Sequence, residues 1–279
     1  MTPSTRQRMS HMYAADFTRV MQTRHIHSGY WDSGSYGVDL VEAQDRFVDV
    51  VVGRMPGGAG DRVLDLGCGP GGVARIVAAS GRRVTALDLS FDQVRLARAA
   101  TESCTAEVVH ADAAVLPCRA ACFDVVLAVE FAVHVPDRAA LFAEVWRVLR
   151  PGGQLVMVDY GIEPSSTRRH RWYISQVGEE RDLPTTQLYL EALQRQGFTV
   201  LTLEDIAYYT TIPYGSALRS EPYRSRLAAY TRDYFPGLGG RLAASLLGPL
   251  ARGWTNAFKR GHARHVLMIA RKPDGAGQP

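Results

Sequence analysis

Lysine is nearly absent from this sequence, although the chain is mildly basic. Only Lys259 and Lys272 are lysines, so arginine supplies almost all of the 32 Lys and Arg residues behind the formal net charge of +4. The arginines are scattered along the chain, whereas proteins that bind nucleic acid gather basic residues on one face or in one run. We therefore expect no nucleic-acid partner.

Long apolar runs and paired cysteines are lacking as well. No run approaches the ~20 apolar residues that span a bilayer, and residues 1–10 lack the apolar region of a signal peptide. No histidines or carboxylates are paired at metal-ligand spacing. The cysteines have no CxxC spacing, which favours reduced thiols; they are Cys68, Cys104, Cys118 and Cys122. These absences predict a cytoplasmic protein with no membrane contact and no metal.

The order of apolar segments indicates the fold class. The 279 residues, 46% of them hydrophobic, suffice for one α/β domain with an appendage. Short apolar runs alternate with amphipathic stretches, which is typical of a parallel, doubly wound, Rossmann-like sheet. We expect seven strands at residues 63–66, 83–88, 107–110, 123–130, 154–159, 198–203 and 264–271.

A glycine-rich turn follows the first expected strand. Gly67, Gly69 and Gly72 fit the G-x-G-x-x-G pattern of dinucleotide sites. Asp65, however, would repel a pyrophosphate and would attract the amino group and sulfonium of S-adenosylmethionine. The stretch resembles motif I of the class I S-adenosylmethionine-dependent methyltransferases, D-x-G-x-G-x-G, through Asp65, Gly67, Gly69 and Gly71.

Further acids and amides follow the next strands. Asp88 ends the second strand, where such folds place a carboxylate that binds ribose hydroxyls. Ser90 and Gln93 form a capping-box pattern, so Gln93 serves the cap, the cofactor or both. After the third strand, Asp112 can accept from the adenine amine while the Ala113 N–H donates to the ring. The other cofactor contacts that we expect are His27, Tyr30, Cys68, Leu89 and Glu130.

The resemblance to class I methyltransferases extends over residues 27–159. It rests on D-A-x-x-L-P at 112–117, F-D-x-V at 123–126 and R-V-L-R-P-G-G at 147–153. It implies a class I fold with an antiparallel last strand, and the cofactor S-adenosylmethionine. Within this family the chain looks most like the small-molecule natural-product and tocopherol-like members. His27 and Tyr30 resemble the segment that covers the cofactor in those enzymes, and Glu130 and His134 resemble their E-x-x-x-H stretch. An N-P-P-Y tetrapeptide, found in enzymes that methylate nucleobase amines, is absent.

The final third of the chain is expected to form a substrate lid. It is rich in aromatics, of which we expect half to fill a helical core and half to face an apolar or aromatic substrate; they are Tyr208, Tyr209, Tyr214, Tyr223, Tyr230, Tyr234, Phe235, Trp254 and Phe258. The predicted organisation is a helical cap with the covering segment (1–60), the cofactor-binding core (61–206), the helical lid insert (207–262), and the last strand with its tail (263–279).

These observations predict methyl transfer from S-adenosylmethionine to a small secondary metabolite. His134 is the candidate general base, with an ionisation near the ordinary ~6.5 of histidine, and Asp159 is the second candidate. Alternatively, His134 is satisfied by the backbone. Two other functions stay open: a cyclase that binds the cofactor without methylating, and an NAD-dependent oxidoreductase. The acceptor atom, the substrate and the oligomeric state do not follow from the sequence.

Overall fold

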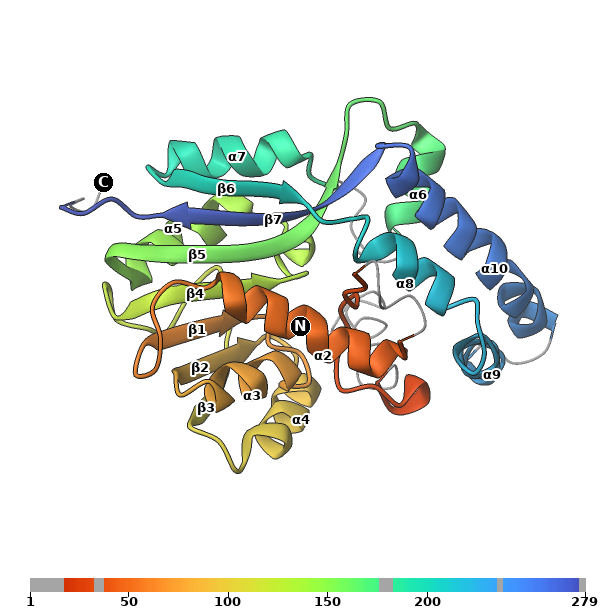
Figure 1. Ribbon diagram of the computed structural model, residues 1–279, viewed down its shortest axis with the longest axis horizontal. Helices are drawn as coiled ribbons and strands as arrows, with labels where there is room; N and C mark the ends of the chain where they lie inside the picture. Colours follow the sequence, from red (N-terminus) through yellow and green to blue (C-terminus); the bar gives the residue numbers. More distant parts are fainter. Residues whose placement is uncertain (1–17, 33–37, 176–182, 235–237, 276–279) are drawn as a thin grey trace, which may run out of the picture.

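The computed structural model describes residues 18–32, 38–175, 183–234 and 238–275. Its centre is a seven-stranded sheet in the order β3-β2-β1-β4-β5-β7-β6 (Figure 1). The first five strands are parallel, and β7 runs antiparallel to β5 and β6, as expected. The strands are β1 Arg62–Leu66, β2 Arg83–Asp88, β3 Ala106–His110, β4 Phe123–Val129, β5 Leu149–Ile162, β6 Thr199–Asp205 and β7 Ala263–Arg271.

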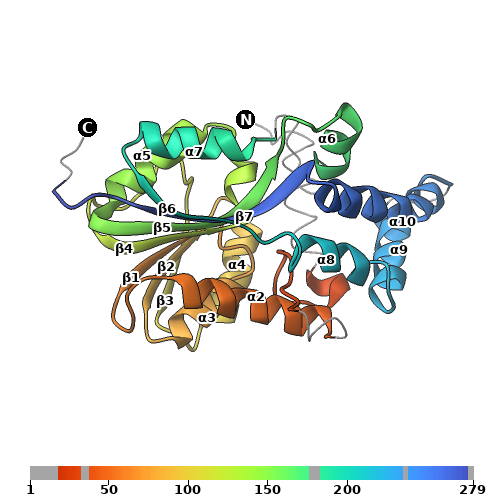
Figure 2. The ribbon, with the colours of Figure 1, turned by 45° about the horizontal axis from the view of Figure 1, so that its top comes forward.

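Helices cover both faces of this sheet. Figure 2 shows α5 and α7 on one face and α2 and α3 on the other. Each face buries its own apolar core, one around Phe142, Trp146 and Tyr189 and one around Phe47 and Val77. The helices are α2 Leu40–Arg54, α3 Gly72–Ala79, α4 Phe91–Thr101, α5 Arg138–Val148, α6 Arg168–Ser175, α7 Thr186–Arg195, α8 Thr211–Ala217, α9 Tyr223–Tyr234 and α10 Leu238–Lys259, with a 3-10 turn, η1, at Ala132–His134.

Short polar side chains start the helices of the core where the sequence predicts them. The Ser90 hydroxyl accepts from the Gln93 N–H at the start of α4, and Asp137 accepts from the Ala140 N–H at the start of α5. These N-caps satisfy backbone donors that have no partner inside the helix. They fix where each helix begins, and therefore where each preceding strand delivers its last residue.

Three helices, α8 to α10, stand between β6 and β7 and lie beyond one end of the sheet (Figure 1). A third apolar core joins them to the rest of the chain, and it buries four of the expected lid aromatics: Tyr214, Tyr223, Trp254 and Phe258. Tyr208 is exposed, and Phe235 lies outside the described residues. The sequence analysis missed α6, which packs against α10. The boundaries of the lid stay a prediction.

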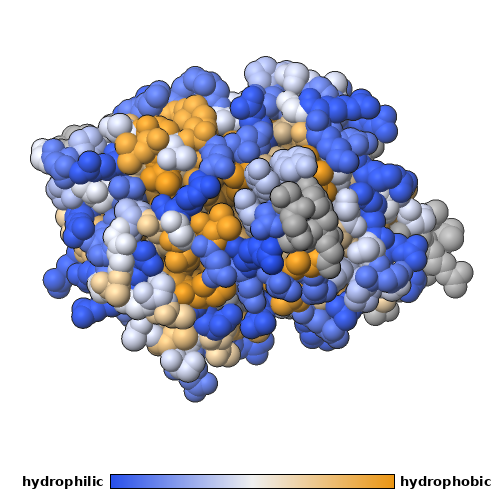
Figure 3. Space-filling view, viewed as in Figure 1, coloured by the Kyte–Doolittle hydropathy of each residue, from blue (hydrophilic) through white to orange (hydrophobic). Residues whose placement is uncertain are grey.

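The outer surface of the β6 edge carries apolar side chains. Leu201 and Leu203 of β6 are exposed, as is Leu188 of α7. On the face seen in Figure 3, apolar surface gathers over this edge and polar surface surrounds it. No helix in the described part of the chain is both long and apolar enough to cross a membrane.

Candidate active site

The glycine turn between β1 and α3 is built on backbone that only glycine adopts readily. Gly67, Gly69 and Gly71 all have positive φ angles, of 65°, 52° and 86°. A Cβ atom at Gly67 would stand 2.0 Å from the Phe131 ring, and one at Gly71 would stand 2.7 Å from the Ala97 backbone. The turn therefore packs closely against β4 and α4, and it brings the N-terminus of α3 to the carboxyl end of the sheet.

Asp65 of β1 is a buried acid without a cation beside it. Its side chain is 2% exposed, and its Oδ2 atom has no hydrogen-bond partner among the described residues. Burial, and secondly the charge of Asp88, raises the pKa of Asp65 from 3.8 to about 8. A buried carboxyl oxygen that lacks a donor is costly. The site therefore fits a ligand that brings a positively charged hydrogen-bond donor.

Asp88 ties the glycine turn to the start of α4. Its Oδ2 accepts from the Gly69 N–H at 3.0 Å and its Oδ1 accepts from the Ser90 N–H at 2.8 Å. The second bond is the one that a capping box would assign to Gln93. The Gln93 side chain is instead buried with its amide oxygen and nitrogen both unpartnered within the described structure. The Gln93 side chain therefore does not serve the capping role that was one of the two expected for it. Its amide oxygen and nitrogen, beside the turn, remain available to a ligand.

Apolar side chains surround the ends of β2 and β3. Leu89, Phe91 and Val115 are 58%, 60% and 74% exposed. Ala113 is buried, and the exposed Asp112 accepts from the Ala114 N–H at 2.8 Å. Exposed apolar side chains flanking a carboxylate fit a flat base with an amino group. Cys68 lies in the turn itself, where burial raises the pKa of its thiol.

The covering segment, residues 25–31, lies across the glycine turn. The Ile26 side chain stands 3.3 Å from where a Gly69 Cβ would be, and the His25 ring stands 2.5 Å from where a Gly72 Cβ would be. The buried amide of Gln44 in α2 holds the segment by donating to the carbonyl oxygens of His27 at 2.6 Å and His25 at 3.3 Å. Through these contacts the covering segment covers the glycine turn.

Tyr30 of the covering segment contacts the residues just before α8. Its ring stacks on Tyr209, with ring centroids 5.3 Å apart, and the Trp31 N–H donates to the Tyr209 carbonyl at 2.7 Å. These contacts join the covering segment to the residues just before α8. Tyr30 thus has a joining role, and the cofactor contact expected for it from the sequence stays a prediction.

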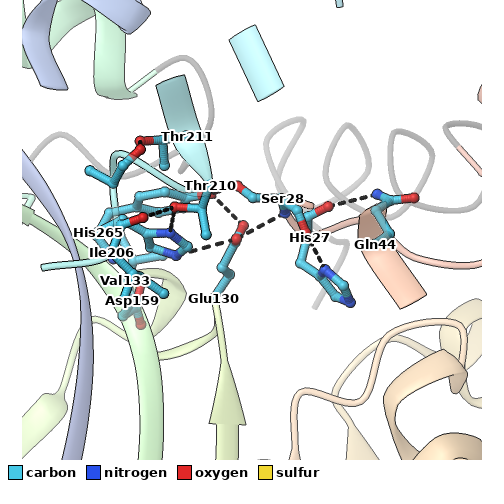
Figure 4. Close-up of polar contacts among 12 residues, drawn as sticks. His27, Ser28, Gln44, Glu130, Val133, Asp159, Ile206, Thr210, Thr211 and His265 are labelled. Carbon is cyan, nitrogen blue, oxygen red and sulfur yellow. Dashed lines mark hydrogen bonds and ion pairs between the residues drawn. The ribbon is translucent and has the colours of Figure 1, made fainter. Parts of the chain in front are cut away.

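Glu130 ends β4 in a left-handed conformation with a φ of 49°. Such backbone is uncommon outside glycine and is held by its surroundings; here the Glu130 N–H donates to the Val158 carbonyl at 2.6 Å. The carboxylate accepts from the Ser28 N–H at 2.9 Å and from the Tyr160 hydroxyl (Figure 4). Burial raises the pKa of Glu130 to about 7.

His134 ends the 3-10 turn that follows Glu130. Its side chain is exposed, yet the protein around it lowers the pKa of His134 to about 4, mainly by desolvation and also through the charge of Arg138. The imidazole is neutral at neutral pH, so the ionisation near 6.5 expected from the sequence is wrong for this environment.

Asp159 supports the turn that carries His134. Its side chain is fully buried; Oδ2 accepts from the Val133 N–H at 2.9 Å and Oδ1 accepts from the Tyr160 N–H at 2.8 Å. Burial raises the pKa of Asp159 to about 7. Since both oxygens bind backbone, the geometry favours a positioning role for Asp159 over the catalytic role expected for it.

Comparisons with known proteins identify the family. Residues 64–157 match a family model described as a methyltransferase domain. The chain is 36% identical over 270 residues to the 27-O-demethylrifamycin SV methyltransferase of Amycolatopsis mediterranei (strain S699), which covers 93% of this chain and 94% of that protein. The chain belongs to the class I S-adenosylmethionine-dependent methyltransferases.

Two other relatives span nearly the whole of this methyltransferase. The (+)-O-methylkolavelool synthase of Herpetosiphon aurantiacus is 29% identical, with 92% of this chain and 89% of that protein covered. The crystal structure of the [4+2]-cyclase SpnF superposes with a TM-score of 0.75 at 25% identity, covering 98% of this chain and 97% of that one. The enzyme is a natural-product-type methyltransferase that acts on a small molecule, so the NAD-dependent alternative falls.

The residues of this methyltransferase fit its cofactor. S-adenosylmethionine supplies a methyl group on a positively charged sulfonium, next to an amino group, a ribose and an adenine. The buried, unpartnered Oδ2 of Asp65 fits the positively charged amino group of this cofactor. Among the described residues no group of three or more His, Cys, Asp or Glu side chains could hold a metal ion.

Several site residues escaped the sequence analysis. Gln44, Ser28, Tyr160 and His265 are buried polar residues of this site. Ser28 and Tyr160 lie next to residues that the analysis singled out, yet nothing in their own type predicts a role. For Gln44 the only signal is a polar residue on an otherwise apolar helix face, and His265 interrupts an apolar strand in the same way.

Proposed function

We propose that this methyltransferase methylates a hydroxyl oxygen of a bulky, partly apolar or aromatic natural product. The observation that carries this proposal is the likeness, over 93% of this chain, to the rifamycin enzyme, whose name describes the methylation of an O-demethylated compound. The synthase from Herpetosiphon is likewise named for an O-methyl product. The four cysteine thiols of this methyltransferase are free, which supports our further proposal that this enzyme acts in the cytoplasm.

We propose roles for the residues of the site on the same basis. Asp65, Gly67 and Gly69 hold the amino-acid part of the cofactor, Asp88 the ribose and Asp112 the adenine amine. Further contacts come from the other cofactor candidates: His27, Cys68, Leu89, Gln93, Ala113 and Glu130. Holding donor and acceptor in line accounts for most of the rate of such a displacement.

His134 is the residue best placed to take the hydroxyl proton. It is accessible, it is neutral at neutral pH, and it stands one short turn beyond Glu130. The acceptor oxygen forms its bond to the methyl carbon as the methyl–sulfur bond breaks, and the hydroxyl proton passes to the imidazole. Asp159 keeps the turn in place through the Val133 N–H.

The test is mass spectrometry of hydroxylated polyketides and terpenoids after incubation with the enzyme and S-adenosylmethionine. We expect a gain of one methyl on substrates with a free hydroxyl and no product from their deoxy or O-methylated analogues. A gain of methyl on nitrogen or carbon would overturn the choice of acceptor. An isomer formed without added mass would favour the cyclase alternative.

A further inference from the structure

A cluster of buried polar side chains joins three separate parts of the molecule (Figure 4). Glu130 of β4, Tyr160 of β5 and His265 of β7 meet at one end of the sheet. Ser28 reaches them from the covering segment: its N–H donates to Glu130 and its hydroxyl lies 2.9 Å from the Tyr160 hydroxyl. Thr210, the residue before α8, reaches them from the other side, with its hydroxyl 2.7 Å from His265 Nδ1.

Counting protons shows that this cluster has two complete bonding patterns. The Thr210 hydroxyl lies near His265 Nδ1 and also 2.9 Å from the Ile206 carbonyl, but it carries only one proton. If Thr210 donates to His265, the ring proton sits on Nε2 and points to the ionised Glu130. If the Thr210 hydroxyl donates to the Ile206 carbonyl, it accepts from the N–H at His265 Nδ1. His265 Nε2 then carries no proton, so it forms a hydrogen bond with Glu130 only when the Glu130 carboxyl is protonated. The two patterns differ by one proton, held at Glu130.

The contact between His265 and Glu130 is the loosest link in this chain. Nε2 and Oε1 are 3.3 Å apart, and Nε2 is buried with no hydrogen bond of good geometry in the described structure. The other contacts of the Glu130 carboxylate, with Ser28 and Tyr160, are tight. This contact connects the Thr210 and His265 part of the cluster with the part that contains Glu130, Ser28 and Tyr160.

We propose that Tyr160, His265 and Thr210 are positioning residues which, through the Glu130 carboxylate, clamp the covering segment and the start of α8 to the cofactor end of the sheet. The clamp is tightest when Glu130 is protonated, because opening it exposes the buried carboxyl to water, which favours the charged form. It loosens as Glu130 ionises. The consequence for cofactor retention rests on the proposed place of the covering segment over the cofactor.

The surroundings of Glu130 put this change near neutral pH. Burial raises the pKa of Glu130 to about 7 and that of Tyr160 well above 10, while it lowers the pKa of His265 to about 3. His27 is also buried, and burial lowers its pKa well below 6.5, so His27 does not supply a cation to offset the carboxylate. Asp159 also has a pKa raised to about 7 and interacts with Glu130, so the assignment needs a variant that silences Glu130 alone.

Amide hydrogen exchange of the full-length protein without ligand tests the clamp independently of cofactor binding. We compare Thr210→Val with Thr211→Val, since Thr211 is an equally buried neighbour whose hydroxyl bonds only the Ala207 carbonyl outside the cluster. We expect Thr210→Val to speed exchange in residues 25–31 about tenfold, corresponding to about 1.4 kcal/mol. Thr211→Val should leave the exchange of that segment as in the parent.

Two further variants separate the clamp from a merely structural role. Corrected for intrinsic exchange rates, protection of residues 25–31 should fall from pH 5 to pH 7 in the parent and stay flat in Glu130→Gln. Thr210→Ser should restore parental protection because it restores the hydroxyl. Equal effects of the two valine variants on residues 25–31, loss of protection throughout the sheet in Thr210→Val, or the same pH dependence in Glu130→Gln as in the parent would each overturn the clamp.

The same variants report on the cofactor. Thr210→Val should speed the dissociation of S-adenosylhomocysteine and raise KM for S-adenosylmethionine several-fold, with kcat unchanged. If exchange responds as expected but dissociation does not, the clamp stands and the covering role of residues 25–31 fails. The two hypotheses are thereby tested separately.

Discussion

Replacing Asp65 by asparagine is expected to stabilise the ligand-free fold and to weaken cofactor binding at the same time. The folded protein buries this carboxyl almost completely, and its pKa rises from 3.8 to about 8. Asparagine has nearly the same shape and no charge. It also removes the repulsion of Asp88, the second cause of the shift. The variant therefore escapes a cost that the parent bears whenever it folds without a cationic ligand.

The size and the pH dependence of the gain follow from linkage. At pH 7 the unfolded chain ionises Asp65 whereas the folded protein keeps it protonated, so folding takes up a proton. This costs about 4 kcal/mol, from about 1.36 kcal/mol for each pH unit above the ordinary pKa. Relaxation and water reduce such costs, so we expect a gain of about 2–4 kcal/mol, or roughly 4–8 °C in Tm.

The sign of the pH dependence provides the sharpest test. A carboxyl with a raised pKa loses stability as pH rises from the unfolded towards the folded pKa. The advantage of Asp65→Asn should thus be largest at pH 8 and nearly vanish at pH 4 in calorimetric melts of ligand-free protein. Asp49→Asn, an exposed acid on α2, serves as the control. A destabilised Asp65→Asn, or a gain that is the same at both pH values, would refute the reasoning.

Three further outcomes concern the same site. Asp88→Asn should raise the dissociation constant of S-adenosylhomocysteine about 10- to 150-fold in calorimetry, because it removes a charged acceptor. Asp92→Asn, at an exposed acid, should leave that constant unchanged. If Asp88→Asn binds the ligand as tightly as the parent does, Asp88 only holds the turn and α4 together. Gly69→Arg should abolish that binding with far-UV circular dichroism unchanged, and retained binding would show that the turn does not face the cofactor. Asp159→Asn leaves one oxygen for two backbone donors, so it should cut kcat about tenfold while cofactor affinity holds; a loss confined to KM would argue against its support of the turn.

Local patterns determine how far the sequence alone could go. The bounds of β2 and the N-cap Ser90 were predicted correctly, because each depends on neighbouring residues. The glycine turn was predictable for the same reason, since a tight turn leaves its own signature. The pairing of Ser28 with Glu130 joins residues 102 positions apart, and no local pattern carries it.

Burial is the other quantity that the sequence could not supply. His134 was expected to titrate near its ordinary pKa, and Asp159 was expected to act as a second catalytic group. Both expectations depend on how much protein surrounds the side chain, which only the assembled sheet, η1 and neighbouring helices determine. The helix α6 was missed because its polar sequence has no apolar stripe of its own.

His134→Ala is the variant that separates catalysis by a base from positioning alone. A base in contact with the acceptor contributes about 10²–10⁴ to the rate, so kcat should fall by that factor while the affinity for S-adenosylhomocysteine is unchanged. His170→Ala, on α6, is the control.

The pH profile of the same variant gives the decisive result. With a pKa of about 4, His134 is an available base throughout the neutral range, and its own ionisation limits turnover only as pH approaches 4. That acidic limb should disappear in His134→Ala. A limb near pH 7, where Glu130 and Asp159 titrate, should persist in the variant because it belongs to the support of the site. Parental turnover and an unchanged acidic limb would remove His134 from the reaction and leave methyl transfer to be driven by positioning.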